Sequence, residues 1–433
     1  MAVKYIINNA TSPLFKSPTG KSREMVLIFG DEVNTSGAPV NGRVPVEFRG
    51  RPGFIPENQL GDTPPLEIYF IDVGQGDSTF IVTPDRKKIL IDGGINNRAY
   101  GFLAWKYRFD KGGPPVDIDL MVLSHADGDH IKGLIPIIQH PRVNVRKTIH
   151  NGIAVFKNNV FKTGLGNLDP SKKYLITRHD SINDLNGLAL SDSFDAWYQV
   201  MVNEGTPYNA VDATTGLINI GDPKIMIDVL GPRLEVYEGK PVCRWFSAEA
   251  PTINGNSVVF KLTYGNITAL FPGDINGDGE KNLLNDSSIA SKLGAHVFKA
   301  PHHGSHDFHY PFLQVVSPQI SVISSGDEPD YGHPRAQFIG AVGKASRSTM
   351  PLVFSTKIAS NFIEVGEKDT QAPDAKLENL DTRALGADSS ARILFKRRLH
   401  GMINVRTDGK NLYAARRVAG ASAWEAYGPL PAV

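Results

Sequence analysis

Apolar segments of strand length recur along this chain. Each ends in, or is followed within three residues by, Gly, Asp, Ser or His. The segments are 68–73, 79–82, 88–92, 120–124, 257–262, 268–271, 296–300 and 320–324. A short continuous apolar run is typical of a strand that is buried on both faces. Where such strands stop side by side, their polar end residues gather at one edge, so the pattern predicts a sandwich of strands with a polar site at its rim.

The composition is that of an ordinary globular protein. The chain has 433 residues, enough for two or three domains of about 100–200 residues each. The formal net charge is +1, so no overall field attracts a polyanion or an anionic membrane. Its one cysteine, Cys243, excludes an internal disulfide framework and a thiolate metal cluster. Without a secretory segment or an apolar run near ~20 residues, we expect a cytoplasmic location and no membrane partner.

Residues 1–62 are predicted to form a small β-barrel. The apolar runs 25–29 and 44–48 are separated by Gly, Pro and polar turn residues. The Gly-Asp turn at 30–31 and the closing segment 53–60 resemble bacterial SH3-type domains, although the usual tryptophan is missing. The resemblance implies a peptide or protein partner for residues 1–60. A packing module without a ligand is the alternative.

The breaker Gly-Asp-Thr-Pro-Pro at 61–65 separates this barrel from a second domain, predicted over 66–433. Within it, 141–250 is irregular in sequence and is interpreted as an insertion over the site. The stretch from about 357 to 390 is polar and is predicted to be loop. The C-terminal region, 392–433, is predicted to contain a β-hairpin over 402–413 with an Asp-Gly turn.

Four side chains suited to metal binding lie within six residues, directly after the apolar run 120–124: His125, Asp127, Asp129 and His130. Imidazole nitrogens and carboxylate oxygens are the ligands that hold a hydrolytic divalent metal. A solvated turn with capping aspartates is the competing interpretation. Further candidates follow other strands: Asp274, the pair His302 and His303, and His333 in a turn. The repeated order of strand and then ligand favours a metal centre.

Six stretches, in the same order as in the family, resemble the metallo-β-lactamase superfamily, in particular the branch with the hydrolase domain of bacterial DNA-uptake competence channels. They are FIDVGQGDS (70–78), ILIDGG (89–94), SHADGDHIKG (124–133), FPGDI (271–275), HHGS (302–305) and YGHP (331–334). The resemblance implies an α+β, αββα fold. In it, a sandwich of two mixed β-sheets is flanked by helices, with the metals at one edge.

The resemblance also implies roles for individual residues. His125 and Asp127 would bind one metal, Asp129 and His130 the other, and Asp274 would bridge the two. Either His302 or His303 would complete the second site; the choice stays open, although His302 follows the strand more directly. Asp72 and Asp92 would support the ligands, with Asp92 orienting the ligand loop. Gln75 and Asp77 lie in the loop that resembles the floor of the active site.

Two departures from the common family pattern bear on the metal. Asp127 stands where a second histidine is usual, and the Asn-Gly-Asn-Ser stretch 254–257 replaces the histidine that usually precedes the bridging aspartate. The first site is therefore rich in oxygen. We expect two divalent metal ions, zinc or manganese, with the oxygen donors favouring manganese. A calcium loop over 274–279 is a rival interpretation of part of this region.

The function expected is that of a metal-dependent hydrolase. A metal pair lowers the pKa of bound water, so hydroxide is available at neutral pH. Asp129 or Asp127 would orient this nucleophile, and His333 would protonate the leaving group. Substrate contacts are assigned to Gln75, Asp77, Asn256, Ser305 and His333.

The resemblance implies a phosphodiester substrate, either DNA or RNA or a small nucleotide, and hence a phosphodiesterase or nuclease. The basic clusters 140–147 and 395–400 could follow a nucleic-acid backbone, although a solvated face is the commoner origin of such runs. The near-zero net charge favours a small diester. Two alternatives stay open. One is a binding or regulatory protein with a degenerate metal site that recognises a partner through the SH3-like domain, and the other is an acyl or lactone hydrolase.

Overall fold

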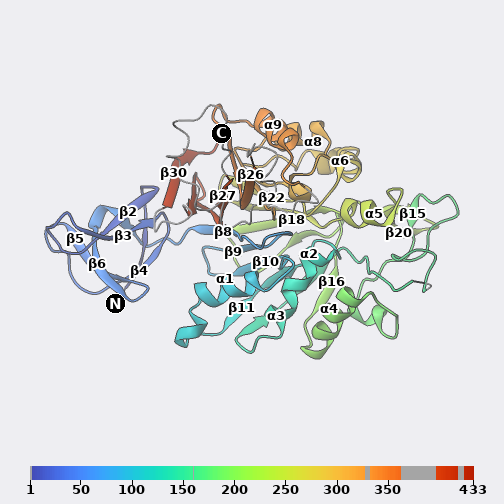
Figure 1. Ribbon diagram of the computed structural model, residues 1–433, viewed down its shortest axis with the longest axis horizontal. Helices are drawn as coiled ribbons and strands as arrows, with labels where there is room; N and C mark the ends of the chain where they lie inside the picture. The colour runs from blue at the N-terminus through green and yellow to red at the C-terminus, as the bar shows by residue number, and fades with distance from the viewer. Residues whose placement is uncertain (1, 159, 327–331, 362–395, 418–423) are drawn as a thin grey trace, which may run out of the picture.

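Two mixed β-sheets pack face to face and carry helices on their outer faces (Figure 1). The computed structural model describes residues 2–158, 160–326, 332–361, 396–417 and 424–433. The predicted 357–390 loop falls largely outside these residues. In the part of the chain that is described, no helix is both long and apolar enough to cross a membrane. The predicted αββα sandwich is confirmed.

The first sheet has nine strands. Their order is β16 (Tyr208–Ala210), β14 (Thr148–His150), β12 (Leu120–Val122), β10 (Lys88–Ile91), β9 (Thr79–Val82), β8 (Leu66–Phe70), β28 (Ile403–Thr407), β29 (Asn411–Arg417) and β30 (Trp424–Pro431). Strands β10, β12, β14 and β16 run parallel, so their carboxyl ends share one edge. The predicted C-terminal hairpin is confirmed, because β28 and β29 pair antiparallel around Asp408 and Gly409.

The second sheet has seven strands. Their order is β17 (Gly216–Ile218), β18 (Ile225–Gly231), β21 (Val259–Tyr264), β22 (Ile267–Phe271), β23 (Val297–Lys299), β24 (Ile320–Ile323) and β25 (Leu352–Ser355). Strands β22 to β25 run parallel. Their carboxyl ends therefore also meet at one edge.

Side chains of successive residues point to opposite faces of each strand and so belong to different cores. In β8, Ile68 and Phe70 enter the core between the sheets, whereas Tyr69 faces the outer layer. Both faces are covered, which explains why these strands are apolar without alternation. The first sheet is covered by α1 (Arg98–Lys106), α3 (Ile135–Ile138) and α4 (Asp192–Asn203), and the second by α6 (Gly277–Leu284), α7 (Ser287–Ala290), α8 (Tyr310–Val316) and α9 (Ala336–Ala345).

The stretch 141–250, which was predicted to be irregular, contains regular strands, while its interpretation as an insertion over the site stays a prediction. Strands β14, β16, β17 and β18 all come from this stretch and extend both sheets. Their signal was missed because β14, β16 and β17 have only three residues each and the stretch is rich in turn residues. Two small sheets also form there, β13 (Val143–Val145) with β11 (Val116–Ile118), and β20 (Lys240–Arg244) with β15 (Tyr174–Leu175) and β19 (Glu235–Tyr237).

An antiparallel sheet of seven strands precedes the sandwich. Its order is β3 (Arg23–Ile28), β2 (Thr11–Phe15), β6 (Arg51–Pro56), β5 (Arg43–Phe48), β4 (Glu32–Thr35), β1 (Val3–Ile6) and β7 (Leu60–Gly61). It has a core of its own around Leu14, Val33 and Ile55. Its likeness to an SH3 domain stays a prediction.

This N-terminal sheet is fixed to the sandwich by a buried ion network. Arg406, in β28, donates to the backbone oxygen of Phe29 and to Asp31 Oδ1, at 2.5 and 2.9 Å. On the sandwich side, Arg406 Nη2 lies 3.9 Å from Glu67, a buried carboxylate that Lys106 also contacts at 3.0 Å. Burial opposes ionisation of Glu67, but Lys106 and Arg406 outweigh it and lower the pKa of Glu67 to about 2. Arg406 therefore links the N-terminal sheet to the sandwich through contacts with both.

Candidate metal centre

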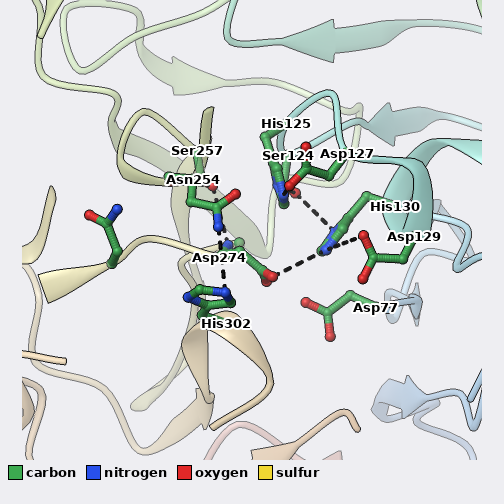
Figure 2. A network of polar contacts seen from close by, with 12 residues as sticks. Asp77, Ser124, His125, Asp127, Asp129, His130, Asn254, Ser257, Asp274 and His302 are labelled. Atoms are coloured by element: carbon green, nitrogen blue, oxygen red, sulfur yellow. Dashed lines mark hydrogen bonds and ion pairs between the residues drawn. The ribbon is translucent and has the colours of Figure 1, made fainter. Parts of the chain in front are cut away.

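The loop after β12 brings four of the predicted ligands to the edge of the first sheet (Figure 2). His125 and Asp127 lie in the loop itself, and Asp129 and His130 lie in the short helix α2 (Gly128–Ile131). Asp127 occupies the position before this helix, yet its side chain makes no capping hydrogen bond. The interpretation of these residues as a solvated, capped turn is therefore wrong, since His125 and His130 are fully buried.

The second sheet supplies the opposite wall. Asp274 follows β22 and is buried, and its backbone amide donates to Ser257 Oγ at 3.2 Å. His302 and His303 follow β23 in a turn in which both residues have left-handed φ angles, +46° and +54°. In Figure 2 the side chains of Asp274 and His302 lie across a common space from those of Asp129 and His130. The two sheets thus deliver their strand-end residues to one place, as the sequence pattern predicted.

Three imidazoles are held through Nδ1. His125 Nδ1 lies 2.9 Å from Ser124 Oγ, His130 Nδ1 lies 2.9 Å from Asp92 Oδ2, and His303 Nδ1 lies 3.1 Å from the backbone oxygen of Ser324. Their Nε2 atoms are buried and make no hydrogen bond to any described residue. A hydrogen bond at Nδ1 fixes a histidine in the tautomer that offers Nε2 to a metal. Buried Nε2 atoms that have no hydrogen-bond partner among the described residues fit a metal site.

Carboxylate oxygens surround these nitrogens. Asp274 Oδ2 lies 3.3 Å from His130 Nε2 and 3.0 Å from His303 Nε2. Asp129 Oδ2 lies 3.4 Å from His303 Nε2, and Asp127 Oδ2 lies 3.6 Å from His125 Nε2. The ligand atoms of His125, His130 and Asp274 are all within 4.8 Å of one another, as are those of Asp129, His130 and His303. These two sets of donor atoms therefore overlap at His130. Asp274 belongs to the first set and lies beside His303 of the second.

The pKa shifts of the buried histidines show that the surrounding carboxylates favour positive charge in this cluster. Burial lowers the pKa of His130, but Asp274 and Asp92 outweigh this and hold the pKa well above its usual value. The same balance raises the pKa of His303, where the charges of Asp274 and Asp77 outweigh the effect of burial. Protons on these imidazoles therefore supply, in the metal-free protein, charge that a cation would otherwise supply.

Metal affinity is consequently expected to rise with pH. Because the surrounding carboxylates raise the pKa values of His130 and His303 and so favour their protonated forms, a metal has to compete with protons for these nitrogens, and acid favours the protons. The apparent affinity should increase by up to about tenfold per pH unit for each proton displaced. Competition titrations with a chromophoric chelator between pH 6 and 8 would measure this. An affinity that stays constant across the range would contradict the protonated imidazoles.

Of the two histidines left open by the sequence, His303 is the one whose Nε2 faces Asp129 and Asp274. His302 lies at the margin, with Nε2 3.5 Å from the side-chain nitrogen of Asn254. Position along the chain after β23 was a poor guide, because the left-handed turn redirects both side chains.

The substrate contact predicted for Asn256 is not supported by the structure. Its side-chain amide donates to the backbone oxygens of Arg244 and Thr252, both at 2.8 Å, and anchors the end of α5 (Glu249–Gly255). Asn254, in the same stretch, has the orientation expected for a contact and faces His302 instead (Figure 2). Asparagines two residues apart cannot be told apart by sequence alone when a helix ends between them.

The remaining predicted residues differ in their distance from the cluster. Gln75 Nε2 donates to Asp129 Oδ2 at 3.2 Å, so this residue lies at the site. Asp72 instead accepts from the amide of Gly74 and pairs with Arg98, and so holds the loop rather than a ligand. Ser305 Oγ accepts the amide of Asp307 within its own turn.

His333 lies beside the two histidines of the turn. The ring centroids of His333 and His302 are 5.8 Å apart, and those of His333 and His303 are 6.2 Å apart. Burial, with the neighbouring imidazoles adding to it, lowers the pKa of His333 to about 4. At neutral pH this side chain is therefore an uncharged imidazole, which donates a hydrogen bond more readily than a proton. Its role as a proton donor stays a prediction.

The calcium interpretation of 274–279 is wrong. Asn276 caps α6 by accepting the amide of Gly279, and exposed Asp278 pairs with Lys281 within the helix. These side chains are therefore committed to a helix start and do not converge on a cation.

The basic cluster 140–147 does not line the site. Arg146 pairs with Asp117 at 2.8 Å, and Lys147 lies beside Met121 at the beginning of β12 and β14, whereas His125 follows the carboxyl end of β12. The cluster 395–400 forms part of β27 (Lys396–His400), paired with β26 (Lys357–Asn361), but Phe395 and the side chains of this strand lie outside the described residues.

One buried cation at the site was missed. Lys299, the last residue of β23, is 4% exposed and contacts both Asp77 and Asp274. The available signal was a lysine inside an apolar strand, immediately before the ligand turn.

Asp92 is expected to be essential for metal affinity although it is not placed as a ligand. It accepts from Ser124 N and Oγ at 2.8 and 2.7 Å while it holds His130. Asp92→Asn should weaken metal binding by about 10–100-fold, the usual cost of losing an outer-shell carboxylate. Isothermal titration with Mn²⁺ would check this, with Asp119→Asn, at the beginning of β12, as the control. Wild-type affinity in Asp92→Asn would show that His130 needs no such partner.

The comparison with protein families agrees with this geometry. A family model described as the metallo-beta-lactamase superfamily matches residues 71–326, more than half of the chain. The chain therefore belongs to the metallo-β-lactamase superfamily, whose members are generally metal-dependent hydrolases.

Within that superfamily, the chain is related to competence proteins. ComE operon protein 3 of Bacillus subtilis (strain 168) is 24% identical over 288 residues, which cover 63% of this chain and 30% of that protein. Competence protein ComA of Neisseria gonorrhoeae is 35% identical over 82 residues, or 19% of this chain and 12% of that protein. The chain thus spans less than a third of either relative.

A solved structure of a metallo-beta-lactamase from Cronobacter sakazakii, a HARLDQ motif mutant, is also similar. It shares 15% sequence identity with a TM-score of 0.27, covering 53% of this chain and 75% of that one.

Proposed function

We propose that this protein is a metal-dependent phosphodiesterase. The observation that carries the proposal is the convergence of the Nε2 atoms of His125, His130 and His303 on Asp129 and Asp274, each imidazole fixed through Nδ1. Such a set fits two divalent cations with mixed nitrogen and oxygen donors, zinc or manganese. The bound ions would polarise the phosphate group and lower the pKa of water.

The residues divide into two metal sites in this proposal. His125 and Asp127 would hold one ion, Asp129, His130 and His303 would hold the other, and Asp274 would contribute to this metal centre as well. Asp127 is the most exposed of these carboxylates, with 37% of its side chain accessible, and it lies at the open side of the cluster. It is therefore suited to orient an incoming water as well as to bind metal.

The chain's own polar groups at the margin of the site would bind the substrate. Gln75 reaches Asp129, and Asn254, His302 and His333 lie on the side of the turn after β23. Uncharged amide and imidazole groups donate hydrogen bonds to phosphate oxygens and to the leaving oxygen. A small diester is favoured over a long nucleic acid, because the basic cluster 140–147 lies at the other end of β12.

Turnover of bis(4-nitrophenyl) phosphate tests the proposal. The metal-loaded protein should release nitrophenolate, and a chelator should abolish the reaction until Mn²⁺ or Zn²⁺ is restored. Hydrolysis of an aryl acetate or a lactone without diesterase activity would favour the acyl-hydrolase alternative. Stoichiometric metal without any hydrolysis would favour a binding protein. Single-stranded DNA and a cyclic dinucleotide offered in parallel would separate nuclease activity from cleavage of small diesters.

A further inference from the structure

A buried lysine lies against the metal cluster. Lys299 Nζ contacts Asp77 Oδ2, lies 3.1 Å from Asp274 Oδ1 and donates to the backbone oxygen of Gly273 at 2.8 Å. The Lys299 and Asp77 side chains are each 4% exposed. Removing an ammonium group from water costs free energy, and carboxylates in contact with it compensate for the lost hydration. The contact is therefore built into the site.

The lysine divides the two oxygens of Asp274 between two tasks. Oδ1 contacts Lys299, whereas Oδ2 faces His130 Nε2 and His303 Nε2. Because Oδ1 lies against Lys299, Oδ2 is the oxygen of Asp274 that is directed toward the cations that the imidazoles would bind. Lys299 thereby fixes both the orientation of this carboxylate and the number of oxygens it presents.

The same ammonium neutralises Asp77. Apart from the contact with Lys299, neither oxygen of Asp77 has a hydrogen-bond partner among the described residues, and the closest imidazole nitrogen, His303 Nδ1, is 3.7 Å away and already bonded to Ser324. Once Asp77 is paired with Lys299, the carboxylates that still need positive charge are Asp92, Asp127, Asp129 and Asp274. Two divalent cations neutralise these four charges.

We propose that Lys299 is a positioning residue that acts as a fixed internal counter-cation: it restricts Asp274 to a single metal-facing oxygen and cancels the charge of Asp77. This inference rests on the proposed metal site and deepens it. Lys299 would act on the cations through the two carboxylates that it contacts. Its effect passes through Asp274 and Asp77, and metal-dependent stability reports it independently of turnover.

Unfolding temperatures measured with a chelator and with saturating Mn²⁺ test the proposal. In Lys299→Met, Asp77 and Asp274 lose their counter-charge, so the chelated protein should unfold about 5 °C or more below the chelated wild type. Mn²⁺ restores positive charge, so the unfolding temperature of the metal-saturated variant should fall much less. The difference in unfolding temperature between the Mn²⁺-saturated and the chelated protein, here called the gap, should therefore be wider than in the wild type. Asp77→Asn removes one negative charge and should narrow the gap. The double variant Asp77→Asn/Lys299→Met should return close to the wild-type gap.

An equal fall of the unfolding temperature with and without metal in Lys299→Met would reduce Lys299 to a packing residue and overturn the inference. The inference would also be overturned if Lys299→Met and Asp77→Asn both widened, or both narrowed, the difference in unfolding temperature between the metal-saturated and the chelated protein. If Lys299→Met cannot be recovered, the narrowing in Asp77→Asn and the recovery of the double variant decide the matter in the same way. A wild-type protein that Mn²⁺ and Zn²⁺ fail to stabilise would instead refute the proposed metal site itself.

Discussion

Asp274→Ala is expected to abolish hydrolysis and to remove most of the bound metal. The carboxylate stands between His130 and His303 and is buried, so alanine leaves a gap where the two donor sets meet. Loss of an outer-shell partner already costs about 10–100-fold. Loss of the shared carboxylate should therefore lower kcat/KM by about a thousandfold or more, measured with an aryl phosphodiester alongside metal content by mass spectrometry.

Asp278→Asn provides the matched control. This aspartate lies four residues further on, is exposed and, among the described residues, pairs with Lys281 in α6. Exposed pairs of this kind contribute about 1 kcal/mol or less, so the control should retain metal and activity. If Asp274→Ala kept two metal ions and its turnover, the cluster around Asp274 would not be the active site.

Arg406→Met is expected to weaken the attachment of the N-terminal sheet. The substitution leaves buried Glu67 without one of its cations and removes the bonds to Phe29 and Asp31. Breaking a buried ion pair by removing one partner costs about 3–5 kcal/mol. We expect a loss of this size in urea unfolding at pH 7, together with faster proteolysis between the N-terminal sheet and the sandwich. Arg416→Ala, which removes a partly exposed pair with Glu425, should cost about 1 kcal/mol or less.

The pH dependence of this effect has a defined sign. The pKa of Glu67 is about 2 in the folded protein and 4.5 in the unfolded chain. A depressed carboxylate pKa stabilises the folded state above the unfolded value, and the contribution is lost as the pH falls toward the folded value. The stability difference between wild type and Arg406→Met should therefore be largest above about pH 4.5 and shrink between pH 4.5 and 2. A difference that stays constant through this window would show that Glu67 is not the group Arg406 compensates.

The sequence predicted the features that are coded locally. Runs such as 88–92 and 120–124 are apolar because both faces of the strands are covered, and their polar ends fall at the rim of the sheets. The ligand loop after β12 and the position of Asp274 follow from that rule alone.

Features set by the backbone path or by distant partners could not be predicted. The choice between His302 and His303 depends on two consecutive left-handed residues, and the choice between Asn254 and Asn256 depends on where α5 ends. The role of Lys299 depends on its contacts with Asp77, which lies far away in the sequence, and with Asp274. The very short strands within 141–250 carry too little periodicity to stand out against turn residues.

Anomalous diffraction from crystals grown with Mn²⁺ or Zn²⁺ would show whether the cluster around Asp274 binds two metal ions. We expect two peaks, each about 2.0–2.3 Å from its ligands, with Asp274 Oδ2 adjacent to both. One peak should lie beside His125 Nε2, and the other should lie beside His130 and His303 Nε2. If the protein binds metal in solution but the crystals show no peak at this cluster, or show ions only elsewhere on the protein, the proposed metal centre would be contradicted.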